Sequence, residues 1–504
     1  MRGLFGLCRT GALCLFLLVI VPIAVSGFFV TALDEVSPNK FSQTVTVVSQ
    51  PLAQTFALTA AMLCAMLLTR WLLERFAKVR LSALLCAVWL AAALFWVLGT
   101  GVFPRADSKE VFISAKQFAA NDYAPLRGQY FHKYTYQLYM AFWFEMVARL
   151  LPQLDLNLTL QCMNAVLSVA AMGVTAALCE VFAGRRARYA AFALYLLFLP
   201  MMFFCTFVYD VQWMWLLCSG AFLCFALYVR DRHARYGIAC AALMALAMTT
   251  KLNAAVPLLA LLICMALDAL SNRDARTLGI AALCAALSLA LPSAIVAQYE
   301  LRGGVTMRPD ISMVSRLAMG IQDSPIAPGW YNCYTELFFG PEVTIEEEKE
   351  IATADLVARL EEMAEDPGQT FLFFRDKCLS QWIEPSYEIF WHQNVTVRDG
   401  RFNGLSNAVI RDGEPVHETL LAYMGAFQRM MYLLASVGAI RTLRRGANAA
   451  QLMLPVTVLG GFLYHMLFEA KAQYIFVYAL YLIPMAAQGL CAVDEALARV
   501  RKKN

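Results

Sequence analysis

The sequence predicts an all-α protein that crosses a membrane about twelve times, with helices along the outer membrane face and one large outer loop. Two observations carry this prediction. Of the 504 residues, 60% are hydrophobic and only 15% are charged, whereas soluble proteins have about 45–50% apolar and about 25% charged residues. The apolar residues are also gathered into separate runs, and a run of about 20 is long enough to cross a bilayer as a helix.

The candidate spans follow one another along the chain with short connections. They are 11–32, 53–73, 81–103, 159–183, 189–206, 211–229, 236–250, 252–270, 278–298, 421–440, 452–468 and 472–492. The first run follows Arg2 and Arg9, and Ala24-Val25-Ser26 looks like the cleavage end of a signal peptide. Because the apolar run continues to Leu33, an uncleaved signal anchor is favoured.

Basic residues in the short connections predict which membrane side is cytoplasmic. If the further apolar run 134–151 crossed the membrane, the basic clusters between Arg185 and Arg276 would lie opposite the one at 75–80. That run also contains Gln137, Glu145 and Arg149, which are costly at bilayer depth. We therefore expect 134–151 to be a juxtamembrane helix on the outer surface of a plasma-membrane protein, with both termini cytoplasmic.

This topology divides the chain into four parts. We expect an N-terminal transmembrane hairpin (1–80), a transmembrane core with an outer loop at 104–157 (81–298), an outer loop domain (299–420) and C-terminal transmembrane helices (421–504). In the outer loop domain, Thr344-Ile345-Glu346-Glu347 is typical of a capping box, and Asp366-Pro367-Gly368 would end that helix. The amphipathic stretch Phe371–Ile383 is expected along the membrane interface.

Several functions are disfavoured. The net charge of +4 is small, and the basic residues alternate with apolar runs, so we expect no nucleic-acid partner. The absence of GxxxxGK[ST] and of GxGxxG after a strand disfavours an ATP-driven pump, and the absence of a long internal repeat weakens a transporter built from inverted repeats. Most of the 15 cysteines lie in apolar runs without metal-site spacing, although Cys333 and Cys378 could pair.

Asp107 is the first candidate for chemistry. It lies just after the third span, and Glu110 follows on the same helical face. A carboxylate at such a boundary can act as a general base on an acceptor hydroxyl, whereas the structural interpretation is a helix N-cap. The two carboxylates could bind a divalent cation, but without further oxygen ligands they make a thin site, so no cofactor is assigned.

Four further outer segments carry polar residues. Tyr134, Tyr136 and Gln137 suit sugar contact, with an interfacial aromatic belt as the simpler interpretation. Lysines at a membrane boundary suit a lipid phosphate, although a lysine there can also snorkel to water. The remaining candidates are charged or aromatic residues in short outer turns, namely Asp210, Lys251, Glu469, Lys471 and Tyr474.

Four motifs in this order resemble the GT-C glycosyltransferases, specifically bacterial relatives of the protein O-mannosyltransferases and of the lipid A aminoarabinose transferase. The motifs are Asp107-Ser108-Lys109-Glu110, Tyr134-Thr135-Tyr136-Gln137, Thr249-Thr250-Lys251-Leu252-Asn253 and Glu469-Ala470-Lys471-Ala472-Gln473-Tyr474. Segments beginning at Gly320, Gly329 and Lys377 look like parts of uncharacterised Gram-positive members. The resemblance covers residues 80–490.

The resemblance implies inverting transfer of a sugar from a polyprenyl-phosphate donor to an envelope glycan or protein at the outer face. It makes Asp107 the general base, with Glu110 and Asp210 as candidates for a second acid. Lys251 and Lys471 would hold the lipid phosphate. The substrate would contact Tyr134, Tyr136, Gln137, Glu469 and Tyr474.

This sequence also departs from the family. The acid loop follows the third span instead of the first, the two acids are not adjacent, and the mannosyltransferases' His-Pro-Pro is absent. Two alternatives therefore remain, a transporter or flippase of a lipid-linked sugar and a non-catalytic assembly subunit. A flippase needs a polar path through the bilayer midplane, whereas the charged candidates lie at the outer ends of the spans, which favours an enzyme.

Overall fold

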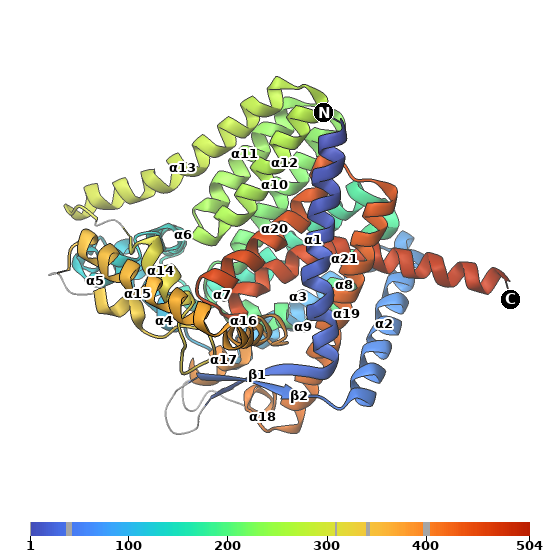
Figure 1. Cartoon of the computed structure of the whole chain (residues 1–504), viewed down its shortest axis with the longest axis horizontal. Helices are drawn as coiled ribbons and strands as arrows, with labels where there is room; N and C mark the ends of the chain where they lie inside the picture. Colours follow the sequence, from blue (N-terminus) through green and yellow to red (C-terminus); the bar gives the residue numbers. More distant parts are fainter. Residues whose placement is uncertain (1, 37–42, 308–309, 339–342, 397–403, 504) are drawn as a thin grey trace.

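The structure, a computed structural model, describes residues 2–36, 43–307, 310–338, 343–396 and 404–503 (Figure 1). Within these residues, nine helices are long and apolar enough to cross a membrane. They are α1 (Arg2–Phe29), α2 (Leu52–Arg75), α3 (Leu81–Thr100), α7 (Leu156–Ala183), α10 (Val211–Asp231), α12 (Ala255–Asn272), α13 (Ala275–Gly303), α20 (Ala449–Leu467) and α21 (Ala472–Lys503). The predicted fold class, an all-α multi-pass membrane protein, is confirmed.

The three other predicted spans are also helical. The run 189–206 is broken into α8 (Arg185–Leu197), α9 (Leu199–Phe203) and a 3₁₀ turn, η3 (Phe204–Thr206), with a bend of 63°. Pro200 stands in the first turn of α9, where its missing N–H is tolerated and a new helix can begin. The run 236–250 forms the shorter α11 (Ala234–Met248), and 421–440 lies inside α19 (Pro415–Arg445).

The helix α21 lies at the centre of the bundle. Of its membrane-span window, 94% is buried, and it packs against α7, α8, α19 and α20. Gly438 of α19 and Gly489 of α21 each face the partner helix backbone, because a Cβ at either position would meet main-chain atoms of the other helix. Such small residues let two membrane helices approach closely. The first turn of this tightly packed helix contains Gln473 and Tyr474.

The segment 104–157, predicted to lie outside, folds into short helices at one end of the bundle (Figure 1). These are α4 (Ala106–Ala119), η2 (Ala124–Arg127), α5 (Gln129–Lys133) and α6 (Gln137–Leu150). With 14 residues, α6 is about 21 Å long, too short for a hydrocarbon core of about 30 Å. Its buried Glu145 is paired with Arg149 at 2.8 Å and with Arg302. The outer location of α6 stays a prediction.

The outer loop domain is also helical and lies beside α4 and α5 in Figure 1. It contains α14 (Met313–Gly320), η5 (Tyr334–Phe338), α15 (Ile345–Glu365), α16 (Pro367–Trp382), α17 (Ile389–Thr396) and α18 (Gly404–Ile410). The predicted capping box is confirmed, since the Glu347 N–H donates to the Thr344 hydroxyl at 3.2 Å and the Thr344 N–H donates to Glu347 at 2.8 Å. The predicted end of that helix at Asp366 is also confirmed.

The structure corrects the predicted end of the first span and excludes one possible disulfide between described cysteines. The helix of the first span ends at Phe29, and Val30 begins β1 (Val30–Val36), which pairs antiparallel with β2 (Gln43–Ser49) in a register from Val30↔Ser49 to Val36↔Gln43. The alternation of Thr and Val in Gln43–Ser49 is a strand signal that the span assignment overlooked. The possible Cys333–Cys378 disulfide is also absent, because both of these described thiols are free.

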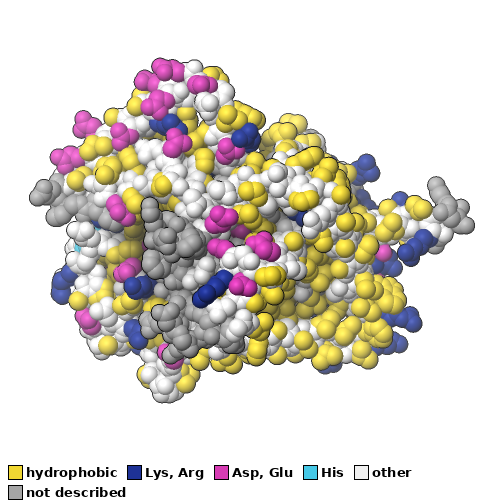
Figure 2. Space-filling view, turned by 90° about the horizontal axis from the view of Figure 1, so that it is seen from below, with side chains coloured by type: hydrophobic (Ala, Val, Ile, Leu, Met, Phe, Trp, Pro, Cys, Tyr) yellow, Lys and Arg dark blue, Asp and Glu magenta, His cyan; other side chains and the backbone are white. Residues whose placement is uncertain are grey.

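The basic connections predicted to be cytoplasmic meet at the other end of the bundle. Arg186 bonds Glu74 at 3.2 Å, Arg70 bonds Asp494 at 2.7 Å, and Arg441 bonds Glu495 at 2.8 Å. These contacts join segments far apart in sequence. Figure 2 shows a broad hydrophobic surface at the right, edged by Lys and Arg side chains, whereas acidic side chains and further basic ones lie toward the left and middle of this face.

Candidate active site

The predicted site residues meet around one cavity of about 460 Å³. Its walls come from α4 to α6, the turn before α10, the turn after α11, the α14–η5 region and the turn between α20 and α21. Of the ten predicted residues, all but Asp210 line this cavity: Asp107, Glu110, Tyr134, Tyr136, Gln137, Lys251, Glu469, Lys471 and Tyr474. Asp210 does not line the cavity but forms an ion pair with Lys251.

Asp107 lies in the first turn of α4 and is not the cap of that helix. The N-cap is Arg105, whose N–H donates to the Ser108 hydroxyl at 3.0 Å. The carboxylate of Asp107 instead accepts a hydrogen bond from the Tyr130 hydroxyl, 3.0 Å from Oδ1. The positive end of the helix dipole favours a negative charge at this position. Glu110 is exposed and lies one turn further along the cavity edge.

The two predicted phosphate-binding lysines have different surroundings. The Lys251 ammonium is 3.2 Å from Asp210, and these side chains are only 12% and 3% exposed. It also lies over the rings of Tyr209, at 4.5 Å, and Tyr474, at 5.0 Å. Such a buried, paired cation does not snorkel to water. In the described part of the chain, by contrast, no ion pair within 4.0 Å joins Lys471 to a carboxylate. Its charge interacts at longer range with Glu388 and Glu469, and its side chain lines the cavity, where a ligand can reach it.

Tyrosines form one wall of the cavity. The ring of Tyr134 lies 5.5 Å from Tyr130 and 6.2 Å from Tyr136, and burial raises the pKa of Tyr134 to about 12. Gln137 is held in place because its side-chain oxygen accepts from the Tyr209 hydroxyl at 2.6 Å. Rings with polar ends offer both a flat apolar surface and hydroxyl partners, which suits a sugar.

The turn between α20 and α21 carries the remaining predicted residues. Burial raises the pKa of Glu469, and the nearby Lys471 acts against that rise. Glu469 lies 3.5 Å from the Tyr474 hydroxyl, and its backbone oxygen contacts the ring of His465 at 3.1 Å. The turn therefore presents one acid, one cation and one ring to the same cavity.

Lys377 of α16 joins this turn to the outer loop domain. Its buried ammonium donates to the backbone oxygens of Gly320 and, at 2.7 Å, Phe468, and burial lowers the pKa of Lys377 to about 7. Gly320 lies directly against the backbone of Phe468, and Gly329, with φ +72°, accepts from the Ala470 N–H at 2.8 Å. The three segments noted for their family resemblance thus contact one another beside the cavity.

Two arginines that line the cavity were not predicted from the sequence. Arg316 of α14 lies 5.1 Å from the centre of the Tyr136 ring, and no pattern around it marks it as special. Arg105 stacks on Trp391 at 3.7 Å, and burial lowers its pKa to about 10. Its position beside Asp107 was a signal that the sequence reasoning did not use. The described residues contain no cluster of three or more His, Cys, Asp or Glu side chains placed to hold a metal ion.

Comparisons with known proteins find a likeness among solved structures. No protein-family model matches the chain, and no curated protein matches its sequence. The crystal structure of the apo form of the Archaeoglobus fulgidus oligosaccharyltransferase matches with 14% sequence identity and a TM-score of 0.37. The match covers 72% of this chain and 43% of that chain, so this protein spans less than half of its length. The likeness concerns the helical arrangement alone.

Proposed function

We propose that this protein is a membrane glycosyltransferase that moves a sugar from a polyprenyl-phosphate donor to an envelope acceptor at the outer face. One observation carries the proposal. A carboxylate, Asp107, two lysines, Lys251 and Lys471, and a wall of tyrosines come from separate parts of the sequence and line a single cavity. These are the groups that such a transfer needs, namely a base, cations for a phosphate and aromatic surface for sugars.

Asp107 is the proposed general base. As the acceptor oxygen attacks the anomeric carbon, its proton moves to the Asp107 carboxylate, and the bond from that carbon to the phosphate oxygen breaks. The bonding electrons leave with the lipid phosphate, and the configuration at the anomeric carbon inverts. Because the Tyr130 hydroxyl occupies Oδ1 at 3.0 Å, the other carboxylate oxygen is the one to receive the proton.

Lys471 is the proposed main contact of the departing phosphate. Charge that develops on a leaving group is stabilised by cations already in place, and more strongly where water is excluded. Lys251 has its charge balanced by Asp210 at 3.2 Å, so its contribution to phosphate binding is smaller. Asp210 serves in this account as the partner of Lys251 and not as a second acid.

Purified protein in lipid nanodiscs, supplied with a panel of polyprenyl-phosphate sugars and candidate acceptors, tests the proposal. The expected result is release of polyprenyl phosphate by the wild type and loss of release in Asp107→Asn. The matched control is Glu350→Gln, which removes an exposed carboxylate from α15, outside the cavity. Movement of a labelled donor across vesicles without any transfer would favour the flippase instead.

A further inference from the structure

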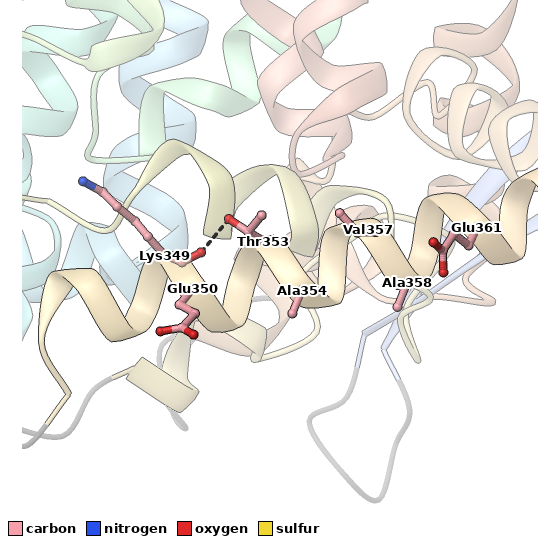
Figure 3. Close-up of a pocket in the computed structure, with 7 residues that line it drawn as sticks. All are labelled: Lys349, Glu350, Thr353, Ala354, Val357, Ala358 and Glu361. Carbon is pink, nitrogen blue, oxygen red and sulfur yellow. Dashed lines mark hydrogen bonds between the residues drawn. The ribbon is translucent and has the colours of Figure 1, made fainter.

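A surface hollow of about 650 Å³ lies along α15 and carries no proposal. Its lining comes from that helix alone, including Lys349, Thr353 and Glu361 (Figure 3). No side chain from another element faces it, so nothing there would recognise a particular ligand. The buried hydrogen-bond network between the β1–β2 hairpin and the cavity is more informative.

The backbone between α16 and α17 is strained in a defined place. Tyr387 and Glu388 have φ values of +55° and +63°, a region that residues other than glycine rarely adopt. The carboxylate of Glu384 holds this turn, because it accepts the N–H groups of Ser386 at 2.8 Å and Glu388 at 2.7 Å. Strain of this kind persists only where the surroundings determine the conformation, and it gathers at functional sites.

The strained turn presents the carboxylate of Glu388 to the cavity wall. This side chain is fully buried, and one of its oxygens accepts the backbone N–H of Gln473 at 2.8 Å. Gln473 lies in the first turn of α21, two residues after Lys471. The side-chain oxygen of Gln473 in turn contacts the ring of His392. Glu388 therefore fastens the start of α21 at the point where the proposed phosphate-binding lysine leaves the turn.

The β1–β2 hairpin holds Glu388 from the other side. The Gln43 amide of β2 donates to the second Glu388 oxygen at 2.6 Å and also to Asp34 of β1 at 3.0 Å. In addition, Ala32 of β1 donates its N–H to the Ile383 oxygen at 3.3 Å, directly before the strained turn. The hairpin thus contacts both the carboxylate and the backbone that presents it.

Charge supports the same arrangement. Burial raises the pKa of Glu388, while the facing cations Lys471 and Arg105 act against that rise. Both cations line the cavity. The buried carboxylate of Glu388 therefore interacts electrostatically with the charge of Lys471, and the hydrogen bond from Gln43 helps to hold that carboxylate in place.

We infer that Glu388 is a positioning residue for the Lys471 turn, and that the β1–β2 hairpin acts on the site by holding this carboxylate through Gln43. The expected effect on catalysis rests on the proposed function, whereas the proposed effect of Glu388 and Gln43 on the structure of the Lys471 turn does not. It assigns a role to the two strands, 30–36 and 43–49, which otherwise look like an addition to the membrane bundle.

Hydrogen exchange of peptides that cover residues 468–476 tests the structural content without any activity. In Gln43→Leu and Glu388→Gln, we expect faster exchange at the start of α21, because the Gln473 N–H loses its fixed acceptor. The matched control is Thr46→Val, an exposed hairpin residue, which should exchange like the wild type. If Gln43→Leu does not fold, Gln43→Asn replaces it, because its side chain is one methylene shorter and its amide no longer reaches Glu388. Unchanged exchange in the folded Gln43 variant would overturn the inference.

Kinetics test the catalytic consequence. Misplacement by 1 Å can cost about 10²-fold in rate, so kcat should fall by up to about that factor, with donor KM changing far less. The Gln43→Leu/Glu388→Gln double variant should lose no more than the worse single variant, because both act through one contact. Additive losses would refute the shared route. If the wild type transfers no sugar, the proposed function fails, whereas the exchange result still decides the role of the hairpin.

Discussion

The contrast between the two cavity lysines gives the sharpest prediction. Lys471→Met keeps the side-chain length and removes a cavity charge that, unlike that of Lys251, forms no ion pair within 4.0 Å in the described part of the chain. A hydrogen bond to a charged group contributes about 1.5–3 kcal/mol, which corresponds to about 10- to 150-fold in affinity. We therefore expect the Kd for polyprenyl phosphate to rise by about 10- to 100-fold, with little change in thermal stability.

Lys251→Met should behave in the opposite way. Its removal leaves Asp210, whose side chain is 3% exposed, as an unpaired buried charge, and breaking a buried pair in this manner typically costs about 3–5 kcal/mol. The main effect should be a lower melting temperature. Adding Asp210→Asn should restore stability, and this neutral pair should bind polyprenyl phosphate within about threefold of the wild type, since the pair carries no net charge.

Ligand-induced thermal stabilisation in nanodiscs measures both quantities, with free polyprenyl phosphate as the probe. The reasoning would be refuted if Lys251→Met/Asp210→Asn were stable but bound the lipid phosphate about as weakly as Lys471→Met. In that case the paired lysine, and not the unpaired one, would be the phosphate contact.

Three further predictions follow from the structure. Asp107→Asn should reduce turnover by about 10²–10⁴-fold with unchanged donor binding. Tyr130→Phe should reduce turnover by about 3- to 10-fold, because one hydrogen bond to Asp107 is lost. Single-turnover transfer measures both effects, and wild-type rates in Asp107→Asn would remove Asp107 from the mechanism. A cysteine at Gln153 should react with an impermeant thiol reagent from outside the cell, whereas labelling only from the cytoplasm would overturn the topology. Burial raises the pKa of Glu384 from 4.5 to about 7, so its stabilising contribution is full below about pH 4.5 and is lost as pH rises through about 7. The melting temperature of the wild type minus that of Glu384→Gln should therefore fall between pH 5 and pH 8, and a difference that grows with pH would contradict this assignment.

The sequence by itself determined features that depend on neighbours along the chain. Hydrophobic runs located the spans, because crossing a bilayer requires local apolar length. Thr344 and Glu347 located the start of α15, because a capping box is complete within four residues. The outer ends of the spans also marked Asp107, Lys251 and Lys471 as candidates, since charge near a membrane is costly and stands out.

Only the tertiary structure decided which groups meet. The pairing of Lys251 with Asp210, and of Gln43 with Glu388, joins residues that are 41 and 345 positions apart. No local pattern encodes such contacts, because they depend on how whole helices pack. The hairpin had a local signal in the alternation of Gln43–Ser49, but its place in the fold did not, because Ala32 and Val45 donate to distant backbone oxygens at Ile383 and Ile326. The role of Glu388 needed even more, since its carboxylate is positioned by a strained backbone that the surrounding fold alone maintains.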